Sequence, residues 1–135
     1  MREHIGRFRG RAIADGKTWV EGYLWVNTSL VKAVIPHITT DGDAIIYEVD
    51  LDTVGECTGL EDKNGMLIFE GDVVEGPDFA AEDGYGRIIW DTDAARFAIA
   101  GESLICDFDN YYGYELEIIG NIHDNPELFG GADNG

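Results

Sequence analysis

The chain has 135 residues, 44% of them apolar and 11% aromatic, which suits one domain or two small subdomains and excludes global disorder. Its 27 acidic and 9 basic residues give a net charge of −18, which argues against DNA or RNA binding unless the arginine-rich start acts alone. Cys57 and Cys106 lie far apart without CxxC spacing, which argues against a disulfide scaffold and a zinc knuckle.

Charge is unevenly placed along the chain. Residues 1–11 hold four arginines and one glutamate, a local charge of +3. The remaining residues carry the other 5 basic and 26 acidic side chains, a charge of −21. High net charge keeps small proteins apart in solution, and an acidic body of this kind is also suited to imitating the charge of DNA.

The first predicted elements are two strands within "FRGRAIADGKTWVEGYLWV", joined by a turn at Asp15-Gly16. Both faces of the second strand are apolar, one with Trp19, Tyr23 and Trp25 and the other with Val20, Leu24 and Val26. Two apolar faces indicate either burial on both sides or an aromatic face that meets a partner. The next segment, "TSLVKAVIPHI", predicts a short helical turn that ends near Pro36.

Residues 44–51, "AIIYEVDL", give the clearest strand prediction. Ile45, Tyr47, Val49 and Leu51 form an apolar face, and the residues between them form a polar face. Ile46 is the apolar exception on the polar face. In residues 57–76, "CTGLEDKNGMLIFEGDVVEG", Asn64-Gly65 predicts a reverse turn and Gly71 breaks the next apolar run. We interpret this stretch as structural rather than as a ligand loop, because Asp62 and Asn64 can bond to nearby backbone.

The rest of the chain predicts strands at "DVVEG", "RIIWD", "RFAIA" and "ELEIIGNI", after which Pro126 ends the pattern. Glycine provides 18 of the 135 residues, well above its typical share of roughly 7%, and favours short strands joined by tight turns. A half-open or closed small antiparallel barrel would bury such strands and leave few edges unpaired. Residues 130–135 are predicted to be a disordered tail.

No residue pattern predicts a catalytic, cofactor or metal site. Asp91, Asp93 and Glu102 have the spacing of a calcium loop, but Ala95 and Arg96 stand where an oxygen ligand and a glycine are needed. The three histidines form no HExxH motif, and the serines lack a GxSxG setting. We therefore predict no catalytic residue, no cofactor and no metal.

Three segments together resemble the YopX family of phage and prophage proteins: "FRGRAIADGKTWVEGYLWV", "YEVDLDTVGECTGLEDKNGMLIFEGDVV" and "EIIGNIHDNPELF". The resemblance runs from about Arg7 to Phe129 and is most specific in the middle segment. It implies a mostly β protein whose C-terminal part is an SH3-like barrel, a phage or prophage gene, and a location in the host cytoplasm. It implies no reaction, because the family offers no catalytic residue to carry over.

The predicted architecture is therefore mainly β, with a small N-terminal subdomain packed with an SH3-like barrel. Residues 1–56 form the N-terminal subdomain, which contains the β-hairpin, and residues 57–129 form the barrel. Because SH3-like barrels often recognise partners through surface aromatics, we select Trp90, Tyr111, Tyr112 and Tyr114 as candidate partner-binding residues. The alternative is that Trp90 is a core residue and the tyrosines cap the barrel.

The predicted function is that of a non-enzymatic phage or prophage accessory protein that binds a protein partner. The alternative is an acidic DNA mimic that inhibits a host DNA-binding or defence enzyme, and an enzyme or metal-dependent module ranks third. Self-association is a further expectation, because the aromatic hairpin and the sheet edges need covering. The start of the chain lacks an apolar signal core, and no run approaches the length of a membrane span, so we expect a cytoplasmic protein without a membrane partner.

Overall fold

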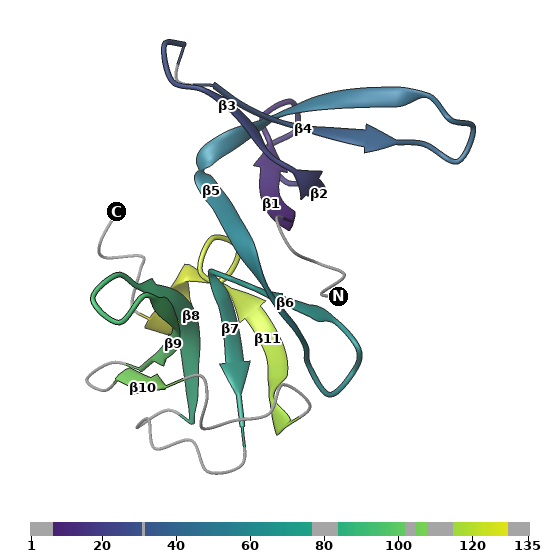
Figure 1. Ribbon diagram of the computed structural model, residues 1–135. Helices are drawn as coiled ribbons and strands as arrows, with labels where there is room; N and C mark the ends of the chain where they lie inside the picture. The colour runs from purple at the N-terminus through teal and green to yellow at the C-terminus, as the bar shows by residue number, and fades with distance from the viewer. Residues whose placement is uncertain (1–6, 31, 77–83, 102–104, 108–114, 130–135) are drawn as a thin grey trace. The chain divides into compact units, whose positions relative to one another are not determined.

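A computed structural model describes residues 7–30, 32–76, 84–101, 105–107 and 115–129 (Figure 1). In these ranges the protein is mainly β, as predicted, and a 3-10 turn, η3 (Pro126–Phe129), follows the last strand. The chain divides into two compact units, Met1–Cys57 (unit 1) and Thr58–Gly135 (unit 2). Strand β5 (Ala44–Glu61) contains the boundary between the two units.

Unit 1 contains an antiparallel sheet with the strand order β2-β1-β5-β4-β3 (Figure 1). Besides β5, its strands are β1 (Arg7–Ala12), β2 (Trp19–Tyr23), β3 (Trp25–Asn27) and β4 (Lys32–Ile38). The predicted turn at Asp15-Gly16 is present, with Gly16 at a φ of 67°. Strands β2 and β3 lie at opposite ends of the sheet order although Leu24 alone separates them in the chain.

The core of unit 1 is built from small and medium-sized side chains: Ala12, Val20, Ala33, Ile35 and Val49. Strand β1 approaches β5 closely at Gly10, where a Cβ atom would lie 2.8 Å from the Cβ of Val49. Glycine at this position therefore lets the two strands pack at a distance that a side chain would prevent.

Strand β5 contains a bulge where it faces β1. Arg9 pairs with Gly55 and Arg11 pairs with Asp50, so residues 51–54 lie opposite Gly10 alone. The buried Thr53 stabilises the bulge, because its Oγ1 accepts a hydrogen bond from the Arg11 N–H at 2.9 Å and donates one to the Asp50 carbonyl at 2.6 Å. A bulge bends a strand and interrupts the alternation of its side chains.

The predicted helical turn before Pro36 is wrong, because residues 32–38 form strand β4. Pro36 pairs with Ile46 of β5, and the Thr39 N–H donates to the Asp43 carbonyl at 2.7 Å near the end of this hairpin. Counting alternate pairs back from this bond, Pro36 falls where β4 exchanges no hydrogen bond with β5. A proline is tolerated in a strand at such a position because no N–H is needed there.

Unit 2 contains a second antiparallel sheet with the order β10-β9-β8-β7-β11, while β6 (Leu67–Phe69) pairs with β5. The strands of this sheet are β7 (Asp72–Glu75), β8 (Tyr85–Asp91), β9 (Arg96–Ala100), β10 (Ile105–Asp107) and β11 (Glu117–Asn121). Its core contains Ile68, Val74, Ile88, Ile99 and Leu116. Among the described residues no pairing joins β10 to β11, so the sheet is open there rather than a closed barrel.

Asp62 organises the turn that was predicted at Asn64-Gly65. Its carboxylate accepts hydrogen bonds from the N–H groups of Asn64 and Met66, each at 2.9 Å, and from Ile118 at 3.0 Å. Burial raises the pKa of Asp62, but these backbone donors and the nearby Lys63 outweigh burial and lower the pKa below its ordinary value of 3.8. The turn and the start of β11 are therefore held together by one buried carboxylate.

Candidate functional site

Trp90 is exposed on β8 and is not a core residue. Its side chain is 44% exposed, and its ring packs edge-on against Phe97 with centroids 5.1 Å apart. The other three candidate residues, Tyr111, Tyr112 and Tyr114, lie outside the described residues. The structure therefore places one member of the predicted aromatic site at the surface of unit 2.

A larger exposed apolar surface lies on unit 1, on the side of β3, β4 and β5 opposite its core. The pairs Trp25–Val34 and Pro36–Ile46 alternate with the buried residues of β4. Trp25 is 59% exposed and Ile46 is 61% exposed. We call this surface the outer face and define it by Trp25, Val34, Pro36 and Ile46.

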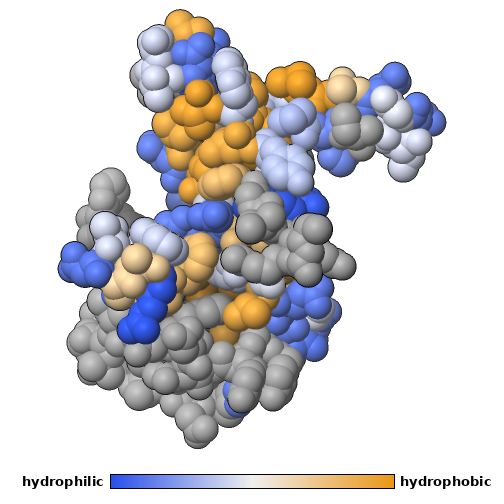
Figure 2. Space-filling view, viewed as in Figure 1, coloured by the Kyte–Doolittle hydropathy of each residue, from blue (hydrophilic) through white to orange (hydrophobic). Residues whose placement is uncertain are grey.

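Charged residues border the outer face. Glu48 pairs with Val34, and its carboxylate lies 4.0 Å from the ammonium group of Lys32, with both side chains largely exposed. The β4–β5 turn adds the exposed carboxylates of Asp41 and Asp43. Figure 2 shows hydrophobic residues gathered over the strands of unit 1, with hydrophilic residues next to them. The outer face is therefore an apolar centre with a mainly acidic border.

The sequence did not predict the outer face, because the residues of this face come from three segments. Their pairing register could not be predicted from the sequence. Trp25 was expected on an aromatic face, and Ile46 was noted as an apolar exception among polar residues. Trp25 and Ile46 belong to one surface, because β4 pairs with the strand of Trp25, β3, on one side and with the strand of Ile46, β5, on the other. The misinterpreted segment around Pro36 is the strand that links them.

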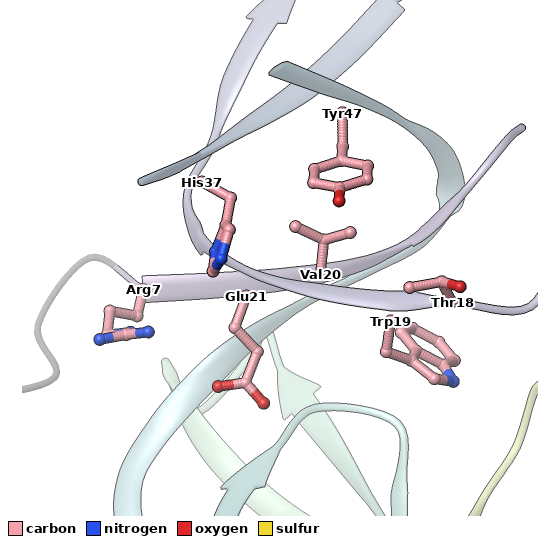
Figure 3. A pocket seen from close by; sticks show the side chains of 7 residues that line it. All are labelled: Arg7, Thr18, Trp19, Val20, Glu21, His37 and Tyr47. Atoms are coloured by element: carbon pink, nitrogen blue, oxygen red, sulfur yellow. The ribbon is translucent and has the colours of Figure 1, made fainter. Parts of the chain in front are cut away.

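Unit 1 also contains a pocket of about 410 Å³ (Figure 3). It is lined by residues of β1, β2, β4 and β5 and of the turn before β2: Arg7, Thr18, Trp19, Val20, Glu21, His37 and Tyr47. In Figure 3 Val20 points toward Tyr47, while Trp19 and Glu21 lie on the opposite side of β2. The rings of His37 and Tyr47 meet edge to face at 6.5 Å. The walls thus combine aromatic rings with one cation and one carboxylate.

Arginines of β1 give this side of unit 1 a basic character. The guanidinium groups of Arg9 and Arg11 lie over the Trp19 ring, 4.9 Å and 5.3 Å from its centroid, at distances typical of cation–π contacts. The Nε atom of Arg7, in the pocket wall, is buried and has no hydrogen-bond partner in the described structure. Buried donors are normally paired, so a ligand acceptor at this atom would satisfy a missing bond.

A second, smaller pocket of about 300 Å³ lies in unit 2. Its walls hold Lys63 and three glutamates, Glu75, Glu115 and Glu117, and the Lys63 ammonium group lies 3.0 Å from the Glu117 carboxylate. Within the described ranges, no group of three or more His, Cys, Asp or Glu side chains is arranged to hold a metal ion. We assign no ligand to this pocket.

The exposed Asp15 has a perturbed pKa for a local reason. The Thr18 hydroxyl and the N–H groups of Lys17 and Thr18 donate hydrogen bonds to its carboxylate and lower its pKa to about 2. Such a cap stabilises the β1–β2 turn and marks a structural rather than a catalytic carboxylate. None of the described helical residues forms a segment long and apolar enough to cross a membrane.

Comparison with known proteins identifies the family. A crystal structure of protein EF1440 from Enterococcus faecalis is similar to this chain at 26% sequence identity, with a TM-score of 0.54, over 91% of this chain and 96% of that chain. The comparison with curated proteins gave no match. A family model described as "YopX protein" matches residues 8–130, which include the three segments that carried the resemblance. The chain therefore belongs to the YopX family.

Proposed function

We propose that this chain binds another protein through the outer face and catalyses no reaction. The observation that supports this function is the exposure of Trp25 and Ile46, 59% and 61%, on one face of the unit 1 sheet. Contiguous apolar surface on a folded protein marks interaction sites, and a buried tryptophan often dominates the energy of an interface. The four residues of the outer face come from paired strands, so the surface is already formed before a partner arrives.

The charges around the outer face favour a partner with an apolar centre and a basic border. Glu48 pairs with Val34, Asp41 and Asp43 are exposed in the β4–β5 turn, and the whole chain carries a net charge of −18. A basic surface is attracted to this border, which increases the rate of association and disfavours wrong partners. A second copy of the chain carries the same −18 and meets repulsion, so we assign the outer face to a different protein.

The proposal includes a finer description of unit 2 as an SH3-like barrel. Strands β7, β8, β9 and β10 form a four-stranded meander, and β11 pairs with β7, its first strand. This order places the last strand of the unit beside the first strand of the meander, an arrangement that a small five-stranded barrel can use. The family resemblance further supports a phage or prophage accessory protein that acts in the host cytoplasm.

The test is a capture experiment from host lysate with three matched variants, followed by calorimetry on the purified captured protein. Trp25→Ser with Ile46→Thr is expected to weaken binding about thirtyfold or more, as loss of a hot-spot tryptophan does. Trp90→Ser removes an indole that is 44% exposed on unit 2 and is expected to leave binding unchanged. The third variant replaces the remaining candidate residues, Tyr111, Tyr112 and Tyr114, by alanine.

The outcomes separate the alternatives. Binding that survives the outer-face variant but is lost with the tyrosine variant would move the site to the predicted aromatic cluster and refute the outer face. Capture of a DNA-binding enzyme that this chain inhibits, with steep salt dependence and no sensitivity to Trp25, would favour the DNA mimic. Sedimentation that shows a dimer disrupted by the outer-face variant would assign this surface to self-association.

A further inference from the structure

Strand β4 lies against β2 at Gly22, and the pocket of unit 1 lies beside this contact. A Cβ atom on Gly22 would lie 3.0 Å from Cγ2 of Ile35 and 3.2 Å from the Pro36 carbonyl oxygen, so the two strands meet closely there. The pocket walls include Glu21 and His37, the residues next to this contact on β2 and β4. The contact between β2 and β4 therefore bounds one side of the pocket.

The pocket wall holds one cation and one carboxylate, Arg7 and Glu21. Strands β1 and β2 pair Arg7 with Tyr23 and Arg9 with Glu21. Arg7 and Glu21 are therefore diagonal neighbours on one face of this ladder, where such neighbours lie roughly 7–8 Å apart. No ion pair joins these two side chains in the described part of the chain. Both charges can therefore contact one small ligand.

The guanidinium group of Arg7 has a donor that needs an acceptor. Its Nε atom is buried and makes no hydrogen bond in the structure as described. A carboxylate suits this position, because a guanidinium group can donate two parallel N–H bonds to its oxygens. Arg9 and Arg11 instead lie over the Trp19 ring. Arg7 therefore gives the pocket a position for one carboxylate.

Another wall of the pocket is aromatic. The rings of His37 and Tyr47 meet edge to face at 6.5 Å, and Val20 points toward Tyr47 (Figure 3). Ile45 pairs with His37 and lies two residues from Tyr47, so these three side chains share one face of the β4–β5 hairpin. Ile45 is 42% exposed and extends the apolar surface beyond the pocket. An apolar side chain of a ligand fits against this wall.

We propose that this pocket binds a free α-amino acid with an apolar side chain. The carboxylate of the amino acid accepts hydrogen bonds from the Arg7 guanidinium group, and its ammonium group donates to Glu21. Its side chain packs on the rings of His37 and Tyr47. These contacts use the cation, the carboxylate and the aromatic surface that the wall offers. The site is separate from the outer face, so either proposal can fail without the other.

Charge favours a zwitterion over other small ligands. The chain carries a net charge of −18, which opposes the approach of a net anion but not of a neutral molecule. Within the pocket, Glu21 repels a phosphate or a dicarboxylate, and Arg7 repels a simple amine. A zwitterion pairs with both groups. The pocket volume of about 410 Å³ lies in the lower part of the range for ligand sites, roughly 300–1,000 Å³, which suits a small molecule.

The test is an NMR titration of the full-length protein with L-leucine or L-phenylalanine. Saturable shifts are expected for the Trp19 indole and the His37 ring, which line the pocket. The indoles of Trp25 on the outer face and Trp90 on unit 2 are internal controls that should not shift. The proposal would be overturned if neither amino acid caused saturable shifts up to millimolar concentration, or if the shifts appeared only at Trp25 or Trp90.

Three analogues of L-leucine test the three contacts one at a time. Acetyl-L-leucine lacks the ammonium group, L-leucinamide lacks the carboxylate, and glycine lacks the apolar side chain. Each is expected to bind about fivefold more weakly than L-leucine or worse, since one contact is lost in each case. If acetyl-L-leucine or L-leucinamide binds as well as L-leucine, the pocket does not recognise a zwitterion and the proposal is wrong.

Variants of the wall assign the contacts to residues. Arg7→Gln is expected to weaken the binding of L-leucine about tenfold, the effect of losing one hydrogen bond to a charged group. Glu21→Gln is expected to weaken it about fivefold, as loss of an exposed ion pair does. Lys17→Gln and Glu61→Gln remove exposed charges outside the pocket wall and serve as matched controls without expected effect. Equal binding by all four variants would exclude both charged contacts.

Discussion

Replacing Asp62 by asparagine is expected to destabilise unit 2 by about 2–4 kcal/mol. The carboxylate is 4% exposed, and it accepts two N–H groups through Oδ1 and the Ile118 N–H through Oδ2. An asparagine keeps one carbonyl oxygen but places an amino group against the Ile118 N–H, which removes that bond. Hydrogen bonds to charged groups contribute about 1.5–3 kcal/mol and neutral ones about half, while relief of carboxylate burial offsets part of the loss.

The assay is urea unfolding followed by circular dichroism at neutral pH, with Glu61→Gln as the matched control. Glu61 is the exposed neighbour of Asp62, so its variant should keep the stability of the wild type within about 0.5 kcal/mol. The same small change in Asp62→Asn would refute the reasoning, because it would mean that the three bonds contribute almost nothing.

Lowering the pH provides an independent check on Asp62. Its folded pKa lies below the ordinary value of 3.8, so the carboxylate stabilises the fold above pH 3.8, and this contribution is lost as the pH falls through the folded pKa. The asparagine variant lacks this titration. The difference in stability between wild type and variant should therefore shrink as the pH falls below about 3.8, and a constant difference would contradict the assignment.

Three further predictions concern turns and close packing. Gly65→Ala should cost about 1–2 kcal/mol in urea unfolding, because Gly65 has a φ of 81° with open space around it, so only backbone strain is added. Gly10→Ala should cost about 1–3 kcal/mol by overpacking against Val49, and a double-mutant cycle with Val49→Ala should recover part of this loss. The NMR titration of Asp15 should give a pKa of about 2, and Thr18→Val should move it toward 3.8.

Alternation of side chains predicted the strands that have one polar and one apolar side. The segment 44–51, predicted from alternation, forms part of β5. The short runs "RIIWD" and "RFAIA", predicted from the turns between them, lie in β8 and β9. Alternation did not predict the strand that contains Pro36. A proline normally argues against a strand, unless it is known that its position needs no backbone hydrogen bond. Alternation also did not predict the bulge at residues 51–54, which places Leu51 at the surface with 39% exposure.

The candidate surfaces depended on register, which pairing between distant segments determines. Trp25 and Ile46 share the outer face because each is paired to β4, Trp25 to Val34 and Ile46 to Pro36. A shift of one residue in either pairing would turn one of these side chains toward the core. The outer face is therefore a property of the pairing between distant segments, so it could not be predicted from local sequence.

The composition of the unit 1 core explains why an exposed apolar face on this unit has consequences for stability. Its buried members include two alanines and two valines, whereas the unit 2 core contains three isoleucines and a leucine. Small side chains remove less apolar area from water, so unit 1 gains less from its core than unit 2 gains. A partner that covers Trp25 and Ile46 adds burial to the unit that has less of it. By mass action it stabilises the folded form by an amount that grows with the logarithm of its concentration over its dissociation constant. Binding at the outer face and the stability of unit 1 are therefore coupled.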